Sequence, residues 1–170
     1  MTHYEALDIL KNYLEEVVAG DKFPVQVQKG DTEQITREPE IHKMRLPHSN
    51  DAKKLAPYII VRYVQSIDNQ DIGKETKSKS VYRFIFCVYD DDESAGSLNL
   101  LNLMDRVKIR LLKDVTIAKR IKLDKTQGLE MFAYEDDTYP FYAGEIITTF
   151  EYGPIEREVY DEKDYRNSFY

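Results

Sequence analysis

The nine residues VYRFIFCVY, from Val81 to Tyr89, constrain the fold of this chain more than any other stretch. They form the most apolar run in the sequence, and they are rich in the β-branched and aromatic residues that favour a strand. Apolar side chains occur at both alternating sets of positions. A strand that is apolar on both faces is typically central in its sheet and covered on both sides. We predict this position for residues 81–90.

Four acidic residues, Asp90, Asp91, Asp92 and Glu93, follow this strand directly. Carboxylates packed this closely repel one another, and two arrangements would stabilise them. They could bind Ca²⁺ or Mg²⁺ through oxygen ligands, as in a small metal-dependent enzyme. Alternatively, they mark a strand-to-helix junction, where the free N–H groups and the positive dipole end of a helix stabilise negative charge. The spacing of an EF-hand loop is absent, so we favour the junction, with Ser94 or an aspartate as the helix cap.

The segment Glu93–Asp114 predicts a helix with a very wide apolar arc. Its apolar side chains cover roughly 240° of the helical wheel, namely Leu98, Leu100, Leu101, Leu103, Met104, Val107, Ile109, Leu111 and Leu112. A helix that packs on a sheet needs only about half of that arc. The remainder must be buried by the other helix of this chain or by another chain.

The rest of the sequence predicts one more helix and several strands. Residues Tyr4–Val18 are amphipathic at helical spacing and end before a glycine. Strands are expected at 58–64, 120–123, 128–135 and 141–152, with a short one within 23–30. Residues 31–54 show no clear period, so they are either a functional excursion or the place of a short hidden element.

The last of these strands alternates clearly. Its even positions from Ile146 to Tyr152 carry Ile, Thr, Phe and Tyr, whereas its odd positions are polar except for Ile147. The order helix, strands, helix, strands predicts an α+β fold: a mainly antiparallel sheet with two main helices packed on it, plus long loops. We expect a single domain over residues 1–155 and a charged, tyrosine-rich arm over 156–170.

Composition excludes several classes of protein. The net charge is -7, from 31 acidic and 24 basic residues, which argues against a dedicated nucleic-acid binder. The N-terminus does not resemble a signal peptide and no apolar run could span a membrane, so we expect a soluble protein made in a cytoplasm. The three histidines lack the spacing of a zinc site, and one cysteine forms no intramolecular disulfide. Thirteen tyrosines without a tryptophan hint at an interface protein.

Residues Pro57 to Glu158 resemble the tail terminator family of tailed phages and prophages, also called tail-completion or tail-to-head joining proteins. The features that match appear in order. A proline precedes an apolar strand, and a second strand ends in tyrosine and aspartates before a glycine and a leucine-rich helix. An acidic EDD turn, the sequence YPFYAGE, an alternating strand and PIERE then follow.

This resemblance implies a non-enzymatic structural protein of the virion tail or neck, assembled in the host cytoplasm and without a cofactor or a metal. It implies a homo-hexameric ring that caps the tail tube protein and binds the head connector protein, while DNA passes through the lumen without specific binding. An acidic lumen would let DNA slide.

In such an assembly we expect contacts with neighbouring subunits or partners at apolar and aromatic residues: Leu100, Leu103, Val107, Tyr139, Phe141, Tyr142, Tyr160 and Tyr165. Three other hypotheses stay open. They are another phage neck or head-completion protein, a small metal-dependent enzyme that uses Asp90–Glu93, and a monomeric binding module such as an immunity or regulatory protein.

Overall fold

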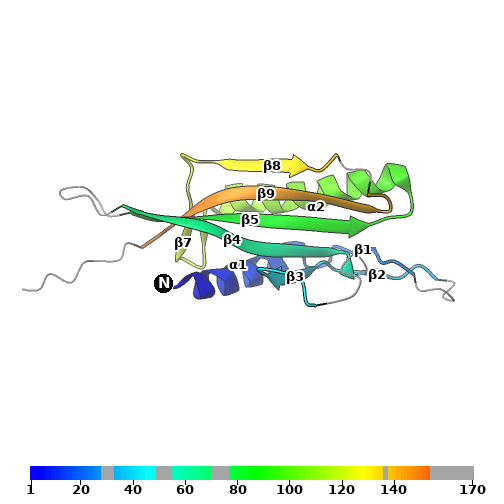
Figure 1. Ribbon diagram of the computed structural model, residues 1–170, viewed down its shortest axis with the longest axis horizontal. Coiled ribbons are helices and arrows are strands. Elements are labelled where there is room, and N and C mark those ends of the chain that lie inside the picture. Colours follow the sequence, from blue (N-terminus) through cyan, green and yellow to red (C-terminus); the bar gives the residue numbers. More distant parts are fainter. Residues whose placement is uncertain (28–32, 49–54, 70–76, 136–137, 154–170) are drawn as a thin grey trace, which may run out of the picture.

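Three long strands form the centre of the protein in the computed structural model, which describes residues 1–27, 33–48, 55–69, 77–135 and 138–153. They are β4 (Tyr58–Asn69), β5 (Lys77–Tyr89) and β9 (Phe141–Tyr152). Figure 1 shows them running together along the long axis of the molecule, with α1 (His3–Val18) and α2 (Glu93–Asp114) lying alongside. The expected α+β class is confirmed.

Shorter strands complete the main sheet, whose order is β3-β4-β5-β9-β7-β6, with β8 also paired to β9. Their bounds are β3 Glu40–Lys43, β6 Thr116–Ile117, β7 Ile121–Leu123 and β8 Leu129–Ala133. A separate small sheet pairs β1 (Phe23–Pro24) with β2 (Thr36–Arg37). The neighbours of the long strands are antiparallel except for β3, which runs parallel to β4. Strands β2 and β3 are the hidden elements of residues 31–54.

Both helices cover the same face of the sheet, which we call the inner face. The side chains of Tyr82, Phe84 and Phe86 on β5 are fully buried there, in one core with the apolar residues of α1 and α2. Tyr82 packs edge-to-face against Phe150 with ring centroids 6.0 Å apart, and its hydroxyl accepts a hydrogen bond of 2.7 Å from the Tyr152 hydroxyl. The even positions of β9 therefore face the core, as their alternation predicts.

The N-terminal helix begins with a capping box. The Thr2 hydroxyl accepts a hydrogen bond from the Glu5 backbone N–H at 3.2 Å, and the Glu5 carboxylate accepts one from the Thr2 N–H at 2.9 Å. Such a cap contributes about 1 kcal/mol. The helix buries Ala6, Leu10 and Leu14.

No helix within the described parts of the chain is long and apolar enough to cross a membrane.

The prediction that β5 is covered on both sides holds for one face only. On the opposite face, which we call the outer face, Val81, Arg83 and Ile85 are half-buried. No helix of the described segments lies over them, because α1 and α2 both pack on the inner face. Residues 154–170, which include the predicted arm with Tyr160 and Tyr165, lie outside the described residues.

Candidate assembly surfaces

Helix α2 has two apolar faces rather than one wide arc. Leu98, Leu101, Ile109 and Leu112 are between 38% and 60% exposed. Their spacing of three, eight and three residues places them within about 80° of one another on a helix with 3.6 residues per turn. Asp105 falls within the same sector. Asp105 and Lys108 lie between the two apolar pairs, with the Lys108 Nζ 3.4 Å from the Asp105 Oδ1. We call these six residues the outer stripe of α2.

The three α2 residues predicted for an interface lie instead in the core of the chain. Leu100, Leu103 and Val107 are at most 3% exposed, because they face the sheet together with Met104 and Leu111. They cannot contact a partner while the domain is folded. The wheel showed too much apolar surface for one sheet contact, but it did not show which part the sheet would take.

The N-terminal helix covers one flank of α2 and leaves the outer stripe bare. The Tyr13 hydroxyl donates a hydrogen bond of 2.9 Å to the Asp114 carboxylate. Burial is the larger cause and this hydrogen bond the second cause that raises the pKa of Tyr13. Arg106 pairs with Asp21, which lies just after the C-terminal end of α1. A groove of about 440 Å³ runs beside this pair and includes Phe23 and Ile109 in its lining. It joins the outer stripe at Ile109.

The outer face of the sheet has apolar residues on either side of a central ion pair, with Arg62 of β4 next to that pair. Register places Val81 beside Thr149, Arg83 beside Ile147, and Ile85 beside Glu145. All of these side chains except Glu145 are half-buried, and Phe132 and Tyr134 next to them are exposed. A sheet face of this composition is unusual for a surface in contact with water alone.

Arg83 and Glu145 form the ion pair at the middle of this face. The Arg83 Nε donates to the Glu145 Oε2 at 2.6 Å, and Glu145 is buried. This hydrogen bond raises the pKa of Arg83. Burial, and next the negative charge of Glu145, raise the pKa of Tyr134. The pair therefore places two opposite charges side by side in an apolar surface, and a pair of this kind is not a strong source of stability.

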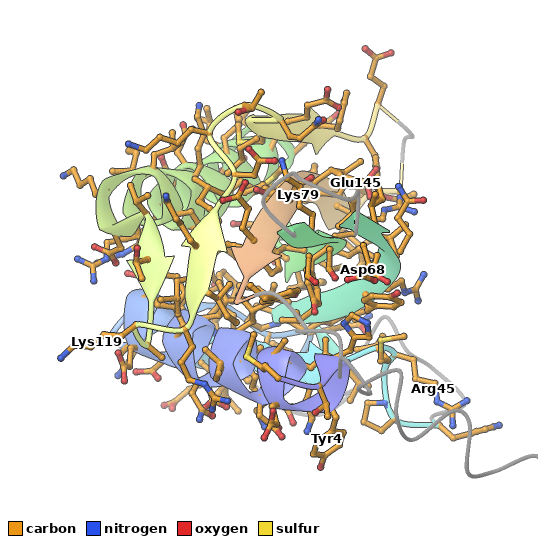
Figure 2. All side chains as sticks on the ribbon, turned by 90° about the vertical axis from the view of Figure 1, so that its left-hand side faces the viewer. Tyr4, Arg45, Asp68, Lys79, Lys119 and Glu145 are labelled. Atoms are coloured by element: carbon orange, nitrogen blue, oxygen red, sulfur yellow. The ribbon has the colours of Figure 1, made fainter. Side chains whose placement is uncertain are left out.

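A second ion pair closes the far end of the outer face. The Lys79 Nζ lies 2.5 Å from the Asp124 Oδ2 and 3.3 Å from Glu151. Figure 2 shows Lys79 and Glu145 on the side of the sheet away from α1. Asp124 is buried, which would raise the pKa of its carboxyl, but hydrogen bonds from Lys79 and the Thr126 N–H outweigh burial and the pKa is lowered. This pair fixes the end of β7 against β5.

The acidic run is a strand-to-helix junction, as favoured from the sequence. Asp92 is the N-cap of α2, and its carboxylate accepts from the backbone N–H groups of Ser94 and Ala95 at 2.9 and 3.2 Å. Asp90 is buried and accepts from the Asp92 N–H at 3.0 Å and from the Asn99 side chain at 2.8 Å. Asp91 and Glu93 are exposed. Within the described ranges, no group of three or more His, Cys, Asp or Glu is arranged to hold a metal ion.

Three predicted interface residues lie around the start of β9, namely Tyr139, Phe141 and Tyr142, and two of them contact this junction. The Tyr139 hydroxyl donates to the Asp91 carbonyl at 3.0 Å, although the residue is 52% exposed. Tyr142 packs over Gly96, where a Cβ atom would lie 2.0 Å from its ring. Phe141 is buried in a small second cluster with Ala56 and Cys87. Only Tyr139 of these three aromatic residues is exposed enough for a large contact with a partner.

Sequence reasoning did not select the outer face as a candidate site. Two signals pointed to it: the apolar residues on both sides of β5, and Ile147 as the exception in the polar set of β9. These residues meet at neighbouring positions of the sheet. No protein-family model matches this chain, and no curated protein is detectably similar to it.

Proposed function

We propose that this protein is a structural subunit of a ring that caps a phage tail tube and joins it to the head connector. The observation that carries this proposal is the pair of bare apolar surfaces on opposite sides of one thin domain, the outer stripe of α2 and the outer face of the sheet. A head-to-tail ring needs two different, complementary surfaces on each subunit, whereas a two-fold dimer needs only one.

The sequence adds independent support for this function. The order of motifs from Pro57 to Glu158 resembles tail terminators, and the α+β fold agrees with that resemblance. The net charge of -7 fits a protein that DNA passes without binding, since like charges repel. The tail tube protein and the head connector protein are the proposed partners.

Virions assembled without this protein provide the decisive experiment. If it terminates tails, electron microscopy will show overlong tails that are detached from filled heads. Tails of normal length beside heads that have lost their DNA would favour the head-completion alternative. Normal, joined particles would exclude both functions.

A further inference from the structure

We propose that the outer stripe of α2 in one subunit packs on the outer face of the sheet in the next copy of this chain. This inference rests on the proposed ring and names the two surfaces that would build it. The helix of the neighbour would form a third layer on the side of the sheet that α1 and α2 leave bare. The sheet would then be covered on both faces, as the composition of β5 requires.

The two surfaces share the same pattern along their length. The outer stripe reads as an apolar pair, a charged pair and a second apolar pair, with the midpoints of the apolar pairs about 16 Å apart at 1.5 Å per residue. Along β5, Val81 and Ile85 lie on either side of Arg83, about 13 Å apart at 3.3 Å per residue. The two spacings agree to within the length of a leucine side chain.

The charges in the middle of each surface are complementary. The outer stripe carries Asp105 and Lys108, and the outer face carries Arg83 and Glu145, with Arg62 of β4 beside Arg83. Asp105 would meet Arg83, and Lys108 would meet Glu145. Each pair is already satisfied within its own chain, so the free subunit leaves none of these four charges unpaired, and docking joins the two pairs into one network of four charges.

This pairing of charges also fixes the direction of the contact. Glu145 is level with Ile85, and Thr149 is level with Val81. With Lys108 at Glu145, the Leu101 end of the stripe lies near Thr149, and Leu112 lies toward Ile85 and Phe132. One helical stripe is narrower than the roughly 800 Å² per partner of a standard interface, so ring closure must reinforce each single contact.

Cysteine cross-linking of the full chain tests both the contact and its direction. In a Cys87→Ala background, Leu101→Cys and Thr149→Cys are combined in one subunit, oxidised, and analysed on a non-reducing gel. The two positions lie on opposite faces of one chain, so each disulfide must join two subunits. We expect a ladder of cross-linked species that ends at the ring size, and only monomer from either single cysteine.

The matched control combines Leu112→Cys with Thr149→Cys, which the proposed direction keeps apart. Light scattering of the reduced proteins reports assembly independently. Assembly without the Leu101–Thr149 ladder, or a ladder from the control pair alone, would overturn this contact and leave the proposed ring intact. Dimers from single cysteines would show a two-fold interface and overturn it as well. A ladder that appears only after deletion of residues 154–170 would also overturn this contact, because it would mean that the arm occupies the outer face in the full chain. Monomers at every concentration would overturn both proposals.

Discussion

Replacing Lys79 by methionine tests how the far end of the sheet is held. The change keeps most of the apolar stem but removes the ammonium group that lies 2.5 Å from the buried Asp124 carboxylate. Removal of one partner from a fully buried ion pair costs about 3–5 kcal/mol, whereas exposed pairs are worth about 0–1 kcal/mol. The Lys79 side chain is 24% exposed and that of Asp124 only 2%, so we expect a loss of about 2 kcal/mol at pH 7.

Acidification should reduce the difference in the free energy of unfolding between the native protein and the Lys79→Met variant. In the native protein the pKa of Asp124 is lowered, so the stability that this group contributes is present above its unfolded pKa and is lost as the pH falls through the folded value. Without Lys79, the burial of Asp124 is opposed only by backbone hydrogen bonds such as that from Thr126, so its pKa rises relative to the native protein. The variant then binds a proton on folding more readily, and it gains stability relative to the native protein between pH 7 and pH 4.

Urea unfolding at pH 7 and at pH 4 measures both effects, and the loss at pH 7 corresponds to a fall in Tm of about 6 °C for a chain of this size. Lys125→Met removes an exposed lysine next to Asp124 and serves as the matched control, with a change within about 0.5 kcal/mol. A loss below about 0.5 kcal/mol for Lys79→Met, or a gap that widens as the pH falls, would refute the reasoning.

Three further substitutions test a close contact at Gly144, the turn at Lys119 and the helix cap at Thr2. A Cβ atom at Gly144 would lie 2.7 Å from both the Phe132 carbonyl oxygen and the Met104 sulfur, so Gly144→Ala should cost about 1–3 kcal/mol in denaturant unfolding; an unchanged midpoint would contradict this packing. Lys119 has a φ of +56° in the exposed β6–β7 turn, so Lys119→Gly should raise stability by about 1 kcal/mol in the same assay, and a loss would count against the turn. Thr2→Ala removes the hydroxyl of the capping box and should cost about 1 kcal/mol, whereas Thr2→Ser should retain most of it.

Patterns in the sequence predicted the long elements but not their full length, since β4 continues to Asn69 and β5 begins at Lys77, beyond the predicted 58–64 and 81–90. The helices and the three long strands have strong patterns because each buries one continuous face, and α2 begins at the predicted Glu93. The acidic junction was also predictable, since the chemistry of a helix start depends on neighbouring residues alone. Strand β3 was not, because four residues paired in parallel with a distant strand leave no local period.

The candidate surfaces depended on information that the sequence does not contain. The wheel of α2 gave the correct amount of apolar surface, but the choice between Leu103 and Leu101 as the buried side is made by the sheet below. Glu145 occupies a polar position of β9 and reads as solvent-exposed. It is buried because Arg83 on the adjacent strand reaches it, and that partner lies 62 residues away in the chain.

The buried Asp90 carboxylate has a consequence for the size of the proposed ring. One of its oxygens accepts a hydrogen bond from the backbone of the junction, and the other accepts one from Asn99 in α2, so this carboxylate ties the helix to the end of β5. In the proposed contact, the helix of one subunit lies on the sheet of the next. The angle between α2 and its own sheet then sets the rotation from each subunit to its neighbour, and the number of subunits that completes a full turn is encoded inside a single chain.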